Sequence, residues 1–117
     1  MSEKLDLFIE GKFTKSDTKN WIEVLDPSNQ EILCKAPCAT DKEVERAITS
    51  AKEAFLTWKE TPPPERSRVM MKYQELLKTN QDDIAKILSK ENGKTFEDAK
   101  GDVWRGIEVV EQAANIT

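Results

Sequence analysis

The stretch that decides the fold runs from Thr40 to Trp58, with the sequence TDKEVERAITSAKEAFLTW. Its first four residues have the pattern of a capping box: the Thr40 hydroxyl accepts a hydrogen bond from a first-turn amide, and Glu43 reaches back to the cap. Behind this cap, apolar residues recur with the helical period. The stripe consists of Val44, Ala47, Ile48, Ala51, Phe55 and Trp58. We therefore expect a helix over about residues 40–59, with this stripe in the core.

Three further helices are predicted after this stretch. The run Pro62-Pro63-Pro64 ends the first helix and supplies a first-turn proline for a second, over about 63–79. Asn80 is expected to cap a third helix over 80–92, which Asn92-Gly93 ends in the left-handed conformation. Thr95 is expected to cap a fourth helix over 95–117. The apolar stripes expected in the core are Val69, Met70, Tyr73, Leu76 and Leu77; Ile84, Ala85, Ile87 and Leu88; and Ala99, Val103, Ile107, Val110 and Ala114.

A short antiparallel β segment is predicted before the helices, over about residues 7–35. It begins as a tight hairpin with Gly11 at its turn. A strand over Trp21–Leu25 is expected from its aromatic and β-branched residues, followed by a turn with Pro27 at its second position. A second strand over 31–35 should end before Pro37, because proline cannot donate to a ladder. Neither parallel pairing nor a strand within 41–58 is expected.

The composition excludes two kinds of partner. The chain has 117 residues with a net charge of -4, and its 18 basic residues are interleaved with 22 acidic ones. Such a surface does not favour nucleic acid, and no segment has the apolar length of a membrane span. The first residues, Met1 to Asp6, resemble neither a secretory signal nor a transit peptide. We expect a cytoplasmic protein, or a mitochondrial matrix protein if the source is eukaryotic and a transit peptide has been removed.

The residues themselves offer no catalytic constellation. The chain has no histidine, which removes the commonest general base and metal ligand. Its four glycines form neither a dinucleotide-binding fingerprint nor a P-loop. The carboxylates have helix-start or solvated-face explanations, namely Glu43, Glu45, Glu53, Glu60, Asp82 and Asp83. We therefore predict no catalytic, cofactor-binding or metal-binding residue in this chain.

Two cysteines, Cys34 and Cys38, are separated by three residues. A redox pair needs two intervening residues, a zinc site needs about four ligands, and a cysteine nucleophile usually needs a histidine base. We interpret Cys34 as a half-buried strand residue and Cys38 as a loop residue, both reduced.

Several motifs of this chain, taken in order, resemble those of the aldehyde dehydrogenase superfamily. The stretch Phe8–Phe13 is similar to the opening hairpin of that family, and Asp26–Glu31 is similar to the turn that follows it. The helix ending Ala51–Trp58 matches the family pattern A-x-x-A-F-x-x-W. Arg66 and Arg68 match the basic start of the second helix, and Glu91–Thr95 resembles the segment before the fourth. The register is continuous from about residue 7 to residue 117.

Two stretches resemble one branch of this superfamily in particular. Residues Gly101–Ala113 and Tyr73–Leu77 are similar to the methylmalonate-semialdehyde and malonate-semialdehyde dehydrogenases, which are CoA-acylating. The resemblance implies an α/β parent enzyme with a Rossmann-like coenzyme domain, of which residues 1–117 form an incomplete N-terminal part. It implies NAD and coenzyme A as substrates, a role in valine, pyrimidine or inositol breakdown, and a homotetramer. The family's catalytic cysteine lies far downstream, so neither Cys34 nor Cys38 inherits that role.

The fourth helix raises the question of completeness. We expect its apolar face to have nothing further to meet in this chain. We therefore expect a piece of a longer enzyme, inactive alone, whose partner is the missing part. Weakened by Gly101 and Gly106, this helix should exchange amide hydrogens faster than residues 44–58. We expect both glycines to face an element of the full enzyme. The alternative is a stand-alone helical module that binds a protein partner through Trp58, Trp104 and Ile107.

Overall fold

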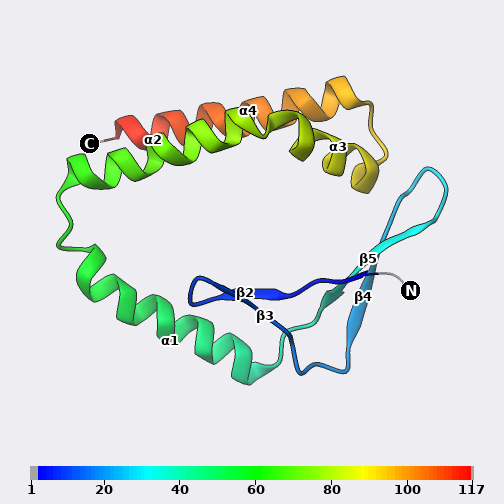
Figure 1. The fold of residues 1–117 in the computed structure, drawn as a ribbon, viewed down its shortest axis with the longest axis horizontal. Helices are drawn as coiled ribbons and strands as arrows, with labels where there is room; N and C mark the ends of the chain where they lie inside the picture. Colours follow the sequence, from blue (N-terminus) through cyan, green and yellow to red (C-terminus); the bar gives the residue numbers. More distant parts are fainter. Residues whose placement is uncertain (1–2, 117) are drawn as a thin grey trace. The chain divides into compact units, whose positions relative to one another are not determined.

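The computed structural model describes residues 3–116 of the chain. These residues belong to two compact units, Met1–Glu60 and Thr61–Thr117. The first unit holds five short strands and one helix, and the second holds three helices (Figure 1). The predicted combination of a β segment with four helices is confirmed.

The strands of the first unit form two small sheets. The hairpin pairs β2 (Leu7–Ile9) with β3 (Lys12–Thr14) in antiparallel fashion. Its two turn residues, Glu10 and Gly11, have φ angles of 58° and 72°. Positive φ at both positions is what a two-residue type I′ turn requires, which explains the glycine there. The second sheet has the order β1-β5-β4, with β4 (Trp21–Leu25) antiparallel to β5 (Ile32–Pro37).

The prediction of a purely antiparallel segment is wrong at one place. Strand β1 (Glu3–Lys4) pairs in parallel with β5, opposite Cys34 and Lys35. A strand of two residues is too short to show an alternation of apolar and polar side chains, so periodicity could not predict it. The other end of β5 also differs, because the strand continues through Pro37. The backbone N–H of Cys38 donates to the Asn20 carbonyl at 3.0 Å, which prolongs the pairing beyond the proline.

Helix α1 (Asp41–Trp58) begins at the predicted capping box. Its apolar stripe, however, is not in the core of the described unit, and that prediction is wrong. Ile48 is 42% exposed and Phe55 is 58% exposed. Among the described residues up to 60, Ile9 is the one buried hydrophobic side chain. The short strands therefore give α1 too little apolar surface to pack against.

The second unit has a better-packed interior. It contains α2 (Pro63–Thr79), α3 (Gln81–Asn92) and α4 (Phe96–Asn115), and α4 packs along both of the others (Figure 1). The buried hydrophobic residues of this unit are Ala85, Ala99, Ile107 and Ala114. Three of these four are alanines, whose small side chains permit close approach of the helices.

The stripe of α4 is therefore in the core, as predicted, but two related expectations are wrong. Its apolar face does meet neighbours, namely α2 and α3. Ile107 is 0% exposed and cannot share a binding surface with Trp104, which is 46% exposed. Helix α2 also departs from prediction in part, because it turns its buried Ser67 inward and leaves Val69, Tyr73 and Leu76 about half exposed.

The helix ends show which capping signals were interpreted correctly. Thr95 caps α4, its hydroxyl accepting from the Asp98 N–H, and Gly93 ends α3 with a φ of 65°. Asn80 is the N-cap residue of α3, as predicted, but its side chain makes no capping hydrogen bond to that helix. Its side-chain amide instead donates to the Leu76 carbonyl at 2.7 Å, at the end of α2. A single residue separates these two helices, and its side chain is directed to the end of the first one.

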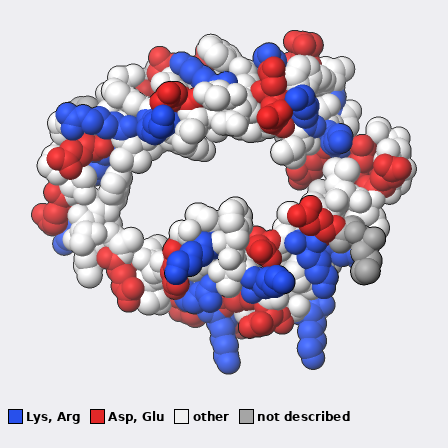
Figure 2. All heavy atoms as spheres, viewed as in Figure 1, with Lys and Arg blue, Asp and Glu red and all other residues white. Residues whose placement is uncertain are grey.

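The surface carries charges of both signs. On the face drawn in Figure 2, lysine and arginine side chains are interspersed with aspartate and glutamate. None of the described helices is both long and apolar enough to cross a membrane.

Candidate functional site

The most highly connected charged group of the first unit is the carboxylate of Glu43. One oxygen, Oε1, accepts from the Asp17 backbone N–H at 2.9 Å. The other, Oε2, accepts from the Ser16 hydroxyl at 3.0 Å and from the Thr40 backbone N–H at 2.7 Å. The Thr40 hydroxyl donates to the same oxygen at 2.9 Å. The carboxylate therefore joins the start of α1 to the loop that follows β3.

These donors change the acidity of Glu43. The pKa of Glu43 is lowered to about 2, mainly by the backbone N–H of Thr40 and then by that of Asp17, with smaller contributions from the two hydroxyls and against the opposing effect of burial. The expected helix-start position of Glu43 is confirmed, and its side chain is buried there. Since both oxygens are engaged and the group stays ionised, it is unsuited to act as a general base. Its role here is to hold the loop against the helix.

The capping-box signal revealed only half of this arrangement. Thr40 and Glu43 are three residues apart, so their contact could be predicted from the sequence. Ser16 and Asp17 lie 27 and 26 residues away from Glu43. The surface hollow beside them contains residues of both charges: Asp17, Thr40, Asp41, Lys42, Glu43 and Arg46.

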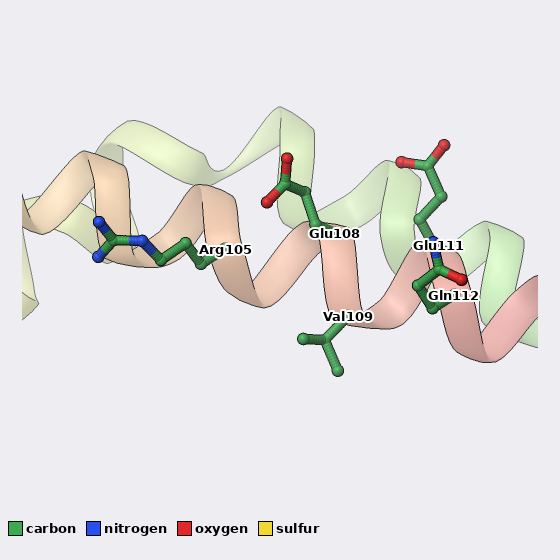
Figure 3. A pocket seen from close by; sticks show the side chains of 5 residues that line it. All are labelled: Arg105, Glu108, Val109, Glu111 and Gln112. Carbon is green, nitrogen blue, oxygen red and sulfur yellow. The ribbon is translucent and has the colours of Figure 1, made fainter.

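A second hollow lies on the second unit, along the outer side of α4 (Figure 3). All five of its residues come from this one helix, and their side chains extend outward from it. Glu108 accepts from the Trp104 indole N–H at 3.1 Å, and Glu111 accepts from the Gln74 amide at 2.9 Å. Arg105 donates to Asp102 at 2.8 Å. These charged groups are already paired on the surface, and the hollow does not assemble a reactive constellation.

Ion pairs at the start of α4 connect the helices of the second unit. Asp102 is paired with Lys94, which lowers the pKa of the Asp102 carboxyl, with a smaller contribution from Arg105. Asp82 of α3 lies 2.7 Å from Lys100 of α4, and this contact lowers the pKa of Asp82 and raises that of Lys100. These pairs are partly exposed, where an ion pair adds little stability. The Asp82–Lys100 pair joins α3 to α4, the Lys94–Asp102 pair joins the preceding loop to α4, and neither prepares an acid or a base for catalysis.

The two cysteines lie in the predicted locations. Cys34 lies in β5, Cys38 follows that strand, and both are free and half-buried. Four residue-to-residue steps of extended chain separate their α-carbons by about 13 Å, whereas a disulfide needs less than about 7 Å. This spacing supports the interpretation of both as reduced structural residues.

The described residues form neither a metal-ligand cluster nor a strand-to-helix phosphate-binding turn. Within residues 3–116, no group of three or more His, Cys, Asp or Glu side chains could hold a metal ion. The backbone positions with positive φ are Glu10, Gly11, Gln30 and Gly93. They belong to strand turns and to a helix end, and not to a turn that leads from a strand into a helix as in dinucleotide-binding loops. The described part therefore does not fit the phosphates of NAD, and the absence of site residues stays a prediction.

Comparison with known proteins gives the family. The family model for the aldehyde dehydrogenase family matches residues 13–117. The methylmalonate-semialdehyde/malonate-semialdehyde dehydrogenase [acylating], mitochondrial, of Homo sapiens is 44% identical over 111 residues, which are 95% of this chain and 21% of the human one. A Dictyostelium discoideum protein with the same name, qualified as probable, is 48% identical over 94% of this chain and 21% of its own. This chain thus spans about a fifth of the length of these relatives.

A solved structure agrees with the sequence relatives. A Sinorhizobium meliloti 1021 protein named as a methylmalonate-semialdehyde dehydrogenase, complexed with NAD, superposes with a TM-score of 0.94 at 38% identity. The superposition covers 99% of this chain and 24% of the bacterial one. The strands and helices described above are therefore part of the aldehyde dehydrogenase fold. On the family match and on this structural likeness, the chain belongs to the aldehyde dehydrogenase family.

Proposed function

We propose that residues 1–117 are the N-terminal part of an NAD-dependent, CoA-acylating methylmalonate-semialdehyde or malonate-semialdehyde dehydrogenase. The observation that carries this proposal is the identity of 44–48% to acylating relatives over 94–95% of the chain. The full enzyme would oxidise a semialdehyde with NAD and pass the acyl group to coenzyme A. The bound NAD of the Sinorhizobium meliloti structure supports the choice of coenzyme.

Within that enzyme, this part would form an outer section of the coenzyme-binding domain. NAD would supply the hydride acceptor when bound elsewhere in the polypeptide, because the described residues do not fit its phosphates. Glu43 would hold the loop that follows β3 on α1, and the α2–α4 unit would provide a packed support. We propose that residues 1–117 alone are inactive, that the rest of the polypeptide is their partner, and that the full enzyme is a homotetramer.

The names of the same relatives support a proposal for the location. The two curated proteins are named as mitochondrial. We propose the mitochondrial matrix if the source cell is eukaryotic, and the cytoplasm if it is not.

The test compares two purified proteins: residues 1–117, and the longer polypeptide that continues past residue 117. Each receives malonate semialdehyde or methylmalonate semialdehyde with NAD, with and without coenzyme A. We expect NADH and an acyl-CoA from the longer protein and neither product from residues 1–117. A longer protein that reduces NAD equally well without coenzyme A, and releases only the free acid, would contradict the acylating assignment. Turnover by residues 1–117 that is lost in Cys34→Ala or Cys38→Ala would contradict the proposed inactivity.

A further inference from the structure

The connection between α3 and α4 contains an asparagine followed by a glycine, Asn92-Gly93. Asn92 is the last residue of α3, and Gly93 follows it in the left-handed conformation, with both residues exposed. The other asparagines of the chain all precede larger residues, namely Trp21, Gln30, Gln81 and Ile116. Glycine has no Cβ, so it leaves its own backbone nitrogen unhindered for attack on the preceding side chain. That attack is the first step of spontaneous deamidation.

The attacking atom would be the backbone nitrogen of Gly93, and the helix end leaves it accessible. At the end of α1 the Lys59 N–H donates to the Phe55 carbonyl at 3.0 Å. At the end of α2 the Asn80 N–H donates to the Leu76 carbonyl at 3.0 Å. Within the described residues, the Gly93 N–H makes no such bond to the backbone of α3. It can therefore approach a side-chain carbonyl carbon without first breaking a backbone hydrogen bond.

The group that would be attacked, the Asn92 side-chain amide, is weakly held. Its nitrogen donates to the Leu88 carbonyl at 3.3 Å. Two other asparagines at helix ends make the same bond to the carbonyl four residues earlier, Asn80 at 2.7 Å and Asn115 at 2.9 Å. An N–H···O bond normally spans about 2.7–3.2 Å, so the bond of Asn92 is the weakest of the three. Its side chain can turn toward Gly93 at the smallest cost.

We propose that Asn92 is a site of spontaneous deamidation in the folded protein. The Gly93 nitrogen gives its proton to a base in the solvent and bonds to Cγ of Asn92. The bond from Cγ to Nδ2 then breaks, and the amide nitrogen takes up a proton and leaves as ammonia. Water opens the resulting succinimide at either of its two carbonyls. One product is aspartate, and the other is isoaspartate, whose main chain is longer by one methylene group.

Both products change the connection between α3 and α4. Each adds a negative charge at the C-terminal end of α3, where the helix dipole disfavours it. Isoaspartate also lengthens a segment that is closed by a hydrogen bond, because the Ser89 hydroxyl donates to the Lys94 carbonyl at 2.7 Å. Lys94 is in turn paired with Asp102 of α4. A longer main chain between Ser89 and Lys94 would therefore disturb the contacts of both helices.

The test is peptide mapping of residues 1–117 and of the longer polypeptide that continues past residue 117. Each protein is incubated at neutral and at mildly alkaline pH and is digested in acid, where deamidation is slow. Mass spectrometry then measures the conversion of amide to acid, and a methyltransferase specific for isoaspartyl residues labels that product. Asn80 and Asn115 are internal controls, because each lies at a helix end and makes the same side-chain bond. The urea-unfolded chain gives the rate without a helix.

We expect Asn92 to be converted several-fold faster than Asn80 or Asn115 in both folded proteins, with isoaspartate among the products. Its rate should stay close to the unfolded rate and should rise with pH, because the attacking nitrogen must lose a proton. In Asn92→Gln the conversion should be several-fold slower, because the longer side chain forms a larger ring. The isoaspartate form should have a lower urea midpoint than Asn92→Asp, which carries the charge without the added methylene.

Four results would overturn the proposal. The first is an Asn92 rate no higher than those of Asn80 and Asn115. The second is a folded rate many-fold below the unfolded one, because the helix end would then protect the amide. The third is conversion in residues 1–117 with none in the longer polypeptide. The fourth is an isoaspartate form as stable as Asn92→Asp, which would remove the effect on the two helices. None of these readouts depends on enzyme activity, so the proposed function is tested separately.

Discussion

Helices α1 and α4 have the same apolar period and opposite surroundings. Ile48 of α1 is 42% exposed, whereas Ile107 of α4 is 0% exposed. The difference lies in the neighbours, because α4 packs along two helices and α1 packs mainly on a three-residue strand. Periodicity therefore shows which face of a helix is meant to be buried. Whether a neighbour covers that face within the same unit depends on elements elsewhere in the chain.

The largest effect is expected from truncating the buried member of this pair. Ile107→Ala should destabilise the second unit by about 2–5 kcal/mol, because it opens a cavity in a packed interior. Ile48→Ala should cost about 1 kcal/mol or less in the same 117-residue chain, because its side chain is already largely in water. Urea unfolding followed by circular dichroism measures both. Equal losses in the two variants would contradict the distinction between the helices.

A smaller loss is expected at the contact between α2 and the end of α4. The buried Ser67 hydroxyl donates to the Ala114 carbonyl, one of the last carbonyls of α4, which lack a partner within their own helix. Ser67→Ala should cost about 1–3 kcal/mol, because the carbonyl loses its donor in a buried place. Thr79→Ala serves as control: its exposed hydroxyl donates within α2, and its loss should cost about 0.5 kcal/mol or less. Similar losses in both variants would show that burial of Ser67 is unimportant.

The first unit should respond to acid through Glu43. Its pKa in the folded protein is about 2, below the ordinary value of 4.5, so folding favours the ionised form. This contribution is complete above about pH 4.5 and is lost as the pH falls toward about 2. Glu43→Gln should lower stability at neutral pH and flatten the stability profile in that acid range, as measured by unfolding at a series of pH values. Glu45→Gln is the control on the exposed side; a matching flattening there would refute the assignment to Glu43.

The smallest effect is a gain in stability within α4. Nothing lies within 4 Å of where a Cβ would be added at Gly101 or Gly106 in the described structure. Gly101→Ala and Gly106→Ala should each stabilise residues 1–117 by about 0.5–1 kcal/mol, because alanine favours the helix. Gly93→Ala should instead destabilise, because the φ of 65° suits glycine. We propose that these helical glycines face another part of the longer enzyme, and a loss of stability there on the same substitutions would support that.

Most of the correct predictions of the fold rest on sequence patterns that span only a few residues. The capping box at Thr40, the cap at Thr95 and the left-handed Gly93 each depend on residues within one turn, so the sequence displays them directly. The errors involve distant partners. The parallel strand β1 depends on pairing with β5, about 30 residues away. The Asn80 side chain lies between the end of α2 and the start of α3, and it bonds to the end of α2.

In the candidate site, too, contacts between nearby residues could be predicted from the sequence and contacts between distant residues could not. Glu43 was recognised as a helix-start residue from its distance to Thr40. Its contacts with Asp17 and Ser16, which add to the effect of the Thr40 backbone N–H on its pKa, depend on how the loop that follows β3 folds back. The interpretation of Cys34 and Cys38 needed only their spacing along the chain, which is why it agrees with the structure.

Hydrogen exchange on residues 1–117 tests the central contrast most directly. The sequence alone favoured faster exchange in the last helix, but the buried positions of Ala99, Ile107 and Ala114 reverse that expectation. Amides exchange slowly where packed contacts resist local opening. We predict that the middle of α4, around Ile107, is more strongly protected than the middle of α1, around Ala51. Equal protection, or stronger protection of α1, would contradict the account of a packed α4 and an uncovered α1.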